Sequence, residues 1–459
     1  MRTRFPLRLE IVLARATGGL SRLARTGGGT TVPGKLLWKL DPAAVDALAR
    51  RLPLGSALVS ATNGKTTTAA MVARILSGKA RLAHNGSGAN LVSGVASALL
   101  AARGAELGLF EVDEAALPEV AHRLRPRAVC LGNLFRDQLD RYGELELVAE
   151  RWRAAVQELP DDSALVVNGD DPQVGDLGRD RDPGTRSVFG VDDPRQAHPA
   201  LQHAADSKWC IRCGTAYEYR AAYIGHLGDY RCPACGHARP PLDVVAREIE
   251  LGGTDRVSFE LVTPEGSRRV QLRVPGLYNV YNALAAASLA RALGASLDEI
   301  HVGLEAFHAA FGRFERIELN GKSLLILLIK NPAGANEAIR TLLAGRSPKL
   351  LLVALNDATA DGKDVSWIWD VDFEPLLPGL ERLVATGDRA AELALRFKYG
   401  GFDEREIEVV PALEAALDRA LDLTPAGGEL VVLPTYTAML ALRDVVAKRG
   451  FVRHYWEAA

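Results

Sequence analysis

The 459-residue chain lacks several features that define whole classes of protein. No apolar run approaches the roughly 18 residues that a membrane-spanning helix needs, and the longest one lies around Leu324 to Ile329. The N-terminus lacks the apolar segment and small-residue cleavage site of a secretory signal, so we expect a cytoplasmic protein. With 55 basic and 57 acidic side chains, the formal net charge is −2. That balance gives no electrostatic reason to expect a nucleic-acid partner.

Cysteine is scarce, yet four of the five cysteines form a metal-binding pattern. These four are Cys210, Cys213, Cys232 and Cys235. Two C-x-x-C turns separated by 18 residues have the spacing of a zinc ribbon. Four thiolates close a tetrahedral shell and leave no position open for a reactant. We therefore predict a structural zinc site in an insertion at residues 205–240.

Residues 56–76 predict a phosphate-binding loop between a buried strand and a helix. The loop N–H groups and the helix N-terminus attract a polyphosphate. Lys65 reaches the β- and γ-phosphates, and the Thr66 hydroxyl ligates Mg²⁺. The full pattern G-x-x-x-x-G-K-[ST] has Gly where this chain has Val59. The candidate ATP-binding residues of the loop are Thr62, Asn63, Gly64, Lys65, Thr66 and Thr67.

The pattern around this loop predicts an α/β fold. Strands at 107–112, 128–131 and 164–168 alternate with helical segments such as 147–159, which is typical of a parallel sheet covered on both faces. Glu111 ends its strand where ligand sites of such sheets lie, and we expect it to complete the Mg²⁺ shell with Thr66. The alternative is a solvated strand end. Residues 242–275 predict a β-hairpin, and a second, smaller α/β domain follows.

The loop ATNGKTTT resembles the GTNGKTTT loop of the Mur ligases and folylpolyglutamate synthases. Further motifs match in the same order, namely FEVDEA (110–115), NLFRDQLDRYGE (133–144), NGDDP (168–172), GLYNVYNALAA (276–286) and GRFE (312–315). The resemblance implies that Asn279 meets the adenine and that Arg313 meets the nucleotide. Gln138 stands where those ligases have a His for a second Mg²⁺, which puts a second metal in doubt.

Two later segments, KNPAGANE (330–337) and NDATADGKDVSWIWDVDFE (356–374), resemble the MurT family, the ligase-like subunits of lipid II isoglutaminyl synthases. This resemblance implies a Mur ligase-like P-loop ATPase domain at 51–314 with the inserted zinc ribbon. It also implies a Rossmann-like domain at 315–459 that contacts a separate GatD-like glutaminase. The implied reaction is ATP-dependent amidation of the D-glutamate α-carboxylate of lipid II, at the inner face of the membrane, through an acyl phosphate. The alternative is a stand-alone amino-acid ligase, but about 50 residues before the loop leave no room for a UDP-binding domain.

The acidic loop 356–374 is the candidate contact with that glutaminase. The cysteines of this chain are accounted for, so the partner has to bring the catalytic Cys and His. A carboxylate from this chain can orient that His, as in a triad. Trp367 and Trp369 indicate a contact surface. Among Asp357, Asp361, Asp364, Asp370 and Asp372, we choose Asp364 as the catalytic residue.

Residues 1–50 begin with an amphipathic segment rich in arginine. One interpretation is a helix that touches anionic lipid. The other, which we favour, is a helix packed on the main domain with its arginine side in water.

Overall fold

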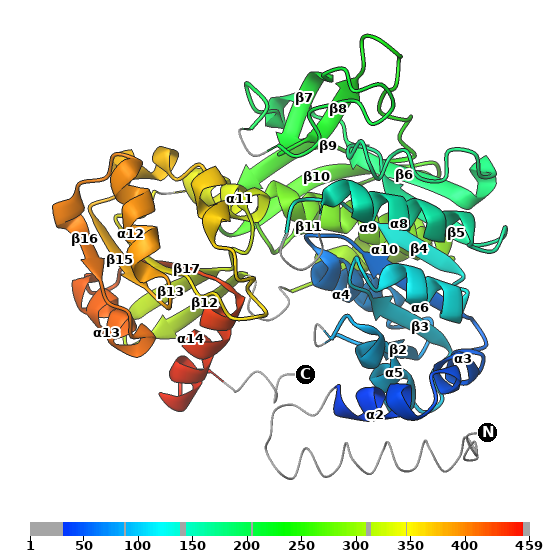
Figure 1. The fold of residues 1–459 in the computed structure, drawn as a ribbon, viewed down its shortest axis with the longest axis horizontal. Coiled ribbons are helices and arrows are strands. Elements are labelled where there is room, and N and C mark those ends of the chain that lie inside the picture. The colour runs from blue at the N-terminus through cyan, green and yellow to red at the C-terminus, as the bar shows by residue number, and fades with distance from the viewer. Residues whose placement is uncertain are drawn as a thin grey trace.

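The structure, a computed structural model, describes residues 31–86, 89–137, 144–202, 205–308, 314–345 and 347–452. Its strands form a nine-stranded sheet, a six-stranded sheet and a two-stranded hairpin. Figure 1 shows the smaller C-terminal lobe beside the large lobe, with the hairpin projecting from the large lobe. The Arg-rich segment up to residue 30 and the candidate Arg313 lie outside the described residues, as does Gln138.

The large sheet has the strand order β11-β10-β9-β6-β5-β4-β1-β3-β2. Its strands are β1 (Ser56–Ser60), β2 (Leu82–His84), β3 (Leu107–Glu111), β4 (Ala128–Leu131), β5 (Ala164–Asn168), β6 (Arg186–Val191), β9 (Val244–Gly252), β10 (Arg256–Thr263) and β11 (Gly266–Leu272). The strands from β2 to β6 pair in parallel, whereas β9, β10 and β11 form an antiparallel meander. β1 lies centrally and is buried along its whole length, so the loop that follows it starts from a rigid position.

Helices cover both faces of this sheet. One face carries α2 (Val32–Leu40), α3 (Ala43–Ala49), α5 (Val92–Ala101), α6 (Leu117–Leu124) and α8 (Leu145–Gln157). The other carries α4 (Lys65–Leu76), α9 (Leu277–Ala292) and α10 (Leu297–Glu305). α9 is rich in alanine and almost fully buried, so it packs closely against both α4 and the sheet. α2 approaches α5 at Gly34, where a Cβ would lie 1.8 Å from the Ser93 carbonyl oxygen.

The insertion between β6 and β9 forms the antiparallel hairpin of β7 (Glu218–Ile224) and β8 (Leu227–Arg231). The C-terminal sheet has the order β12-β13-β17-β14-β15-β16 and is parallel except for β12. Its strands are β12 (Phe314–Leu319), β13 (Lys322–Leu327), β14 (Leu350–Ala354), β15 (Arg382–Thr386), β16 (Ile407–Val409) and β17 (Glu429–Pro434).

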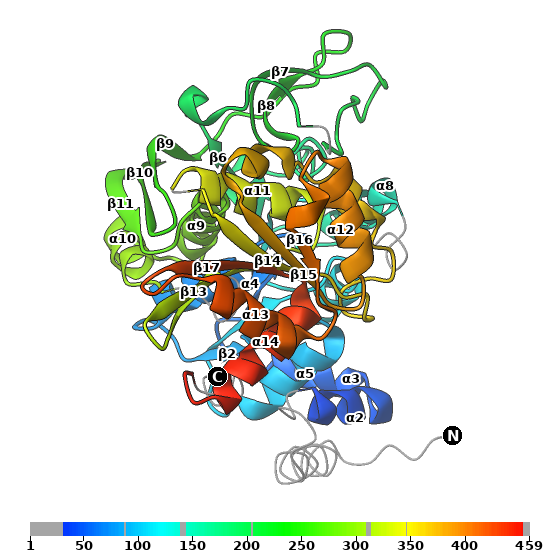
Figure 2. The same ribbon diagram turned by 90° about the vertical axis from the view of Figure 1, so that its left-hand side faces the viewer.

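Two hydrophobic cores also flank the C-terminal sheet. α11 (Pro332–Leu343) and α12 (Ala390–Tyr399) pack on one face, and α13 (Leu413–Leu423) and α14 (Tyr436–Lys448) on the other. Figure 2 shows the helices on the two faces of this sheet. α11 also touches α9 of the large lobe, so it stands at the junction of the two lobes.

The predicted fold class is confirmed: a parallel α/β sheet with the phosphate-type loop, a four-cysteine insertion and a separate C-terminal α/β sheet. Among the described residues, no helix is long and apolar enough to cross a membrane.

Candidate nucleotide and zinc sites

The loop after β1 has the backbone geometry that a phosphate cradle needs. Gly64 has φ +91°, and a Cβ there would lie 2.0 Å from Asn282 Oδ1, so both conformation and space require glycine. α4 begins at the next residue, Lys65. The first N–H groups of a helix have no partner within the helix, and here they face the loop. The sequence therefore turns the positive end of α4 toward any bound phosphate.

Lys65 lies in a buried ion pair inside this loop. Its Nζ donates to Glu114 Oε2 over 2.7 Å and to the Ala61 carbonyl over 2.5 Å, and the side chains of Lys65 and Glu114 are 8% and 7% exposed. Burial opposes the charge of Lys65, but the Glu114 carboxylate outweighs it and raises the pKa of Lys65. Burial likewise opposes ionisation of Glu114, and the charges of Lys65 and Lys330 hold its pKa below the usual range. Both groups are charged, and the ion pair holds the Lys65 ammonium beside the phosphate loop.

Thr66 and Glu111 meet as the sequence predicted. Thr66 Oγ1 donates to Glu111 Oε2 over 2.7 Å. Asn85 fixes the backbone of Glu111 through two hydrogen bonds of 2.8 and 2.9 Å. A hydroxyl and a carboxylate oxygen at the phosphate loop are the hard oxygen ligands that Mg²⁺ takes, together with water and phosphate. These two residues therefore fit a magnesium ion.

A second lysine reaches the loop from the C-terminal lobe. Lys330 Nζ donates to Asp137 over 2.6 Å and to the Thr62 carbonyl over 2.9 Å. The neighbouring Asn331 exchanges two amide hydrogen bonds with Asn63, of 3.1 and 3.3 Å. These contacts bring a cation and an amide of the C-terminal lobe to the phosphate loop.

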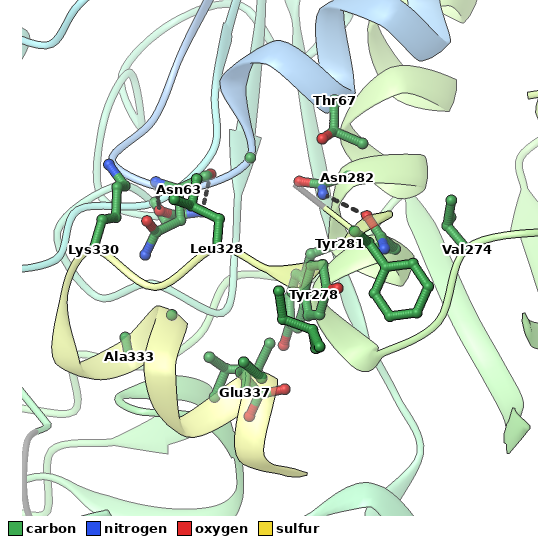
Figure 3. A pocket seen from close by; sticks show the side chains of 18 of the residues that line it. Asn63, Thr67, Val274, Tyr278, Tyr281, Asn282, Leu328, Lys330, Ala333 and Glu337 are labelled. Carbon is green, nitrogen blue, oxygen red and sulfur yellow. Dashed lines mark hydrogen bonds between the residues drawn. The ribbon is translucent and has the colours of Figure 1, made fainter. Parts of the chain in front are cut away.

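A pocket extends from the loop between the two lobes (Figure 3). Its polar lining includes Asn63, Thr67, Asn279, Asn282, Lys330 and Glu337, and its apolar lining includes Ile224, Leu227, Val274, Tyr278, Phe307 and Phe314. Asn279 thus lines the pocket, as predicted for an adenine contact, and its amide also binds the Pro275 carbonyl and Asn282. The insertion contributes Ile224 and Leu227 from the ends of β7 and β8. Apolar walls with a few polar side chains suit a purine nucleoside and its phosphates.

The four cysteines of the insertion come together. Their sulfur atoms all lie within 4.8 Å of one another, with Cys210 and Cys235 at 3.5 Å and Cys213 and Cys232 at 3.4 Å. Zn–S bonds of about 2.3 Å in a tetrahedron give sulfur separations in this range. The cluster fits a zinc ion without an open position. The fifth cysteine, Cys130, is 1% exposed, and burial raises the pKa of its thiol, as expected for a core residue.

The five carboxylates of the acidic loop 356–374 differ in their contacts. Four carboxylates contact other residues of the chain: Asp357 contacts Arg389, Asp361 contacts Thr437, Asp370 contacts Arg136 and Asp372 contacts Asn336. Asp364 is exposed and accepts a 2.8 Å hydrogen bond from the Ser366 N–H. Hydrogen bonds from Ser366 hold the pKa of Asp364 below its ordinary value. Asp364 is therefore an ionised carboxylate accessible from outside.

Three charged residues of the nucleotide site did not follow from the sequence. Glu114, Asp137 and Lys330 lie within the motifs FEVDEA, NLFRDQLDRYGE and KNPAGANE, but the sequence assigned none of them a role. Their roles depend on the pairings of Lys65 with Glu114 and of Lys330 with Asp137, and the latter joins residues 193 positions apart. An acidic residue three positions after Glu111 was the one available signal.

The chain matches two family profiles and is similar in fold to solved ligase structures. Residues 59–207 match the profile of the Mur ligase middle domain, and residues 328–439 match that of the MurT ligase C-terminal. In structure, the chain is similar to a pseudomurein peptide ligase type C from Methanothermus fervidus, with a TM-score of 0.70, 21% identity, and 88% and 80% of the two chains covered. It is also similar to the MurF ligase of Thermotoga maritima in complex with ADP, with a TM-score of 0.62, 17% identity, and 89% and 84% covered.

Two proteins found by sequence share a higher identity with this chain than these solved structures do. The chain is 33% identical to the MurT subunit of lipid II isoglutaminyl synthase (glutamine-hydrolyzing) from Streptococcus pneumoniae, over 94% of this chain and 95% of that protein. It is 31% identical to the same subunit from Staphylococcus aureus strain N315, over 93% and 96%. By the phosphate loop, the two lobes and this near full-length similarity, the chain belongs to the MurT family of Mur ligase-type enzymes.

Proposed function

We propose that this protein amidates the α-carboxylate of D-glutamate in lipid II to D-isoglutamine, with ATP and with ammonia from a GatD-like glutaminase subunit. Because that substrate is lipid-linked, the protein acts at the inner face of the cytoplasmic membrane. The observation that carries the proposal is a complete Lys65, Thr66 and Glu111 constellation in a chain 33% identical, over 437 residues, to a glutamine-hydrolyzing isoglutaminyl synthase subunit.

The first step is phosphoryl transfer. A carboxylate oxygen of the substrate attacks the γ-phosphorus of ATP, the bond to the β-phosphate oxygen breaks, and ADP leaves an acyl phosphate behind. Lys65 and the start of α4 stabilise the charge on the phosphate oxygens, and Lys330 adds a second cation. Thr66 and Glu111 would hold a Mg²⁺ ion, which would supply further positive charge to the same phosphate oxygens. Thr62, Asn63, Gly64 and Thr67 shape the loop around the phosphates.

The second step is amide formation. Ammonia attacks the acyl carbon, the carbon–oxygen bond to phosphate breaks, and the nitrogen loses a proton as inorganic phosphate leaves. All five cysteines are assigned, four to the metal cluster and Cys130 to the core, so the chain offers no thiol nucleophile for glutamine hydrolysis. The partner glutaminase supplies a Cys and a His, and Asp364 accepts the Nδ1–H of that His across the interface.

Exposed aromatic side chains in the same acidic loop and on α12 support this assignment. Trp369 is 50% exposed and Tyr399 is 75% exposed, and their rings lie 6.1 Å apart. Exposed aromatic side chains of this kind anchor protein interfaces. Asp364 itself is charged and free of any described cation contact, which a carboxylate needs to serve a partner's imidazole.

The competing function is a stand-alone amino-acid ligase, in which an amino group rather than ammonia attacks the acyl phosphate. The test is to incubate the chain, its glutaminase partner, lipid II and ATP with glutamine, with ammonium, or with single amino acids, and to identify the product by mass spectrometry. We expect conversion of one carboxylic acid to a primary amide with glutamine or ammonium. A product extended by an amino acid would overturn the proposal.

A further inference from the structure

Glu337 is a buried carboxylate without a hydrogen bond. It belongs to α11, its side chain is 3% exposed, and neither of its oxygens has a hydrogen-bond partner. Arg340 Nη1 lies 3.8 Å and His198 Nε2 lies 3.9 Å from Glu337 Oε1, and both are too distant for hydrogen bonds. Arg340 instead donates to the Tyr223 and Gln196 carbonyls over 2.8 and 2.7 Å.

Such a carboxylate is costly unless something donates to it. Buried polar groups in folded proteins are hydrogen-bonded almost without exception, and an unpaired one points to a missing partner. Glu337 lines the pocket that extends from the phosphate loop. A ligand seated in that pocket therefore lies beside the Glu337 side chain, whose two oxygens are buried and have no hydrogen-bond partner.

The position of Glu337 along the pocket indicates which part of the ligand it meets. Lys330 binds at the phosphate loop, and α11 begins at Pro332, five residues before Glu337. At about 1.5 Å per residue, the helix carries Glu337 roughly 7.5 Å from its start and away from the phosphates. Figure 3 shows Glu337 rising from α11 on the opposite side of the pocket from α4, next to Tyr278. The same pocket is lined by the aromatic side chains of Tyr278, Phe307 and Phe314, which suit a flat base.

We propose that Glu337 selects the nucleotide by accepting a hydrogen bond from a neutral N–H or O–H donor of its nucleoside. A carboxylate oxygen accepts hydrogen bonds, so a ligand that presents an N–H or O–H donor to it binds more tightly than a ligand without one. The nucleoside of ATP presents two such donors, the exocyclic amine of adenine and the ribose hydroxyls. This inference rests on the proposed use of ATP. It adds Glu337 as the residue that recognises the nucleoside through a hydrogen bond.

The experiment is isothermal titration of the full chain, with Mg²⁺, against four nucleotides: ATP, 2′-deoxyATP, 3′-deoxyATP and purine riboside triphosphate. The variant is Glu337→Gln, and Glu337→Met serves as a second variant of similar length. Glu318→Gln is the matched control, because Glu318 is an exposed carboxylate on β12 of the same lobe. We expect Glu337→Gln to weaken ATP binding about tenfold or more, the effect of losing one charge-assisted hydrogen bond.

The analogue whose binding is weakened shows which donor of ATP binds Glu337, because each analogue lacks one donor. The wild-type protein should bind that analogue about tenfold more weakly than ATP, and Glu337→Gln should bind the two nearly equally. Without nucleotide, both variants should melt close to the wild-type protein, because the carboxylate makes no hydrogen bond and loses only its longer contacts with Arg340 and His198.

Two results would overturn the inference alone: equal ATP affinity of wild type and variant, or an equal loss for all four nucleotides together with a lower melting temperature. If the wild-type chain bound none of the four, the proposed function would fail as well.

Discussion

Lys65 is expected to stabilise the empty protein as well as to bind phosphate, and the two roles separate by mutation. Its ammonium is 2.7 Å from Glu114, and both side chains are at least nine-tenths buried. Lys65→Met removes the cation and leaves the carboxylate buried, which costs about 3–5 kcal/mol when one partner of a buried pair is lost. Lys330 also acts on Glu114, so we expect the lower end, about 3 kcal/mol. At about 2 °C per kcal/mol for a unit of this size, the melting temperature falls by about 6 °C.

The double variant Lys65→Met/Glu114→Gln distinguishes the two roles. It removes both charges, so it should regain most of the lost stability while ATP turnover stays abolished. Lys79→Met is the control, because Lys79 pairs with Glu299 at the surface, where water screens the interaction. Thermal unfolding of the nucleotide-free protein, followed by circular dichroism, measures the stability. A Lys65→Met protein as stable as wild type, with a double variant less stable than either, would refute this reasoning.

Three further predictions address the other parts of the site. Cys232→Ser should lower the zinc content from one ion per chain toward none and destabilise the insertion, because a structural zinc contributes folding free energy. Elemental analysis should find zinc retained in the control Cys130→Ala, and a zinc-free wild type purified without chelator would contradict the assignment. Asp364→Asn should keep ammonium-dependent amidation but lose glutamine-dependent activity by up to about 10⁴-fold, the loss seen when a triad carboxylate is neutralised in a protease. Equal loss with both nitrogen donors would move Asp364 to the synthetase site. Lys330→Ala should lower kcat about 100-fold with both donors, since a cation at the transferring phosphate is lost, and an unchanged kcat would remove Lys330 from the mechanism.

Much of the fold followed from the sequence because buried strands have a simple signature. The strands around Val129 and Leu165 are short, apolar runs in the sheet centre, and the structure gives them the predicted bounds. The buried strand predicted before the phosphate loop is β1, around Leu58. β2, β6, β7, β8, β9 and β12 were not predicted: β6 lies inside the large sheet, and the hairpin predicted at 242–275 is a three-stranded meander with β9 as its additional strand. Two of the missed strands lie at sheet edges. β2 is an edge strand of three residues, and β12 is an edge strand whose exposed side chains alternate with buried ones, so neither has the continuous apolar run of a central strand.

The candidate site was predictable where its residues are neighbours in sequence or share a strand end. The Gly64–Lys65–Thr66 turn and the cysteine spacing are local patterns, and Glu111 ends the strand beside β1. Lys330 and Glu337 were not predictable as site residues, because their roles come from the packing of α11 against the other lobe. A helix position has no pattern that indicates an unpaired carboxylate facing a distant loop.

The most direct test of the central claim follows one oxygen atom. Lipid II labelled with ¹⁸O in the D-glutamate α-carboxylate is incubated with the chain, its glutaminase partner, glutamine and ATP, and the released inorganic phosphate is analysed by mass spectrometry. If the carboxylate attacks ATP, one labelled oxygen passes through the acyl phosphate into phosphate for each amide formed. Amide formation with unlabelled phosphate would contradict activation of the carboxylate by phosphorylation.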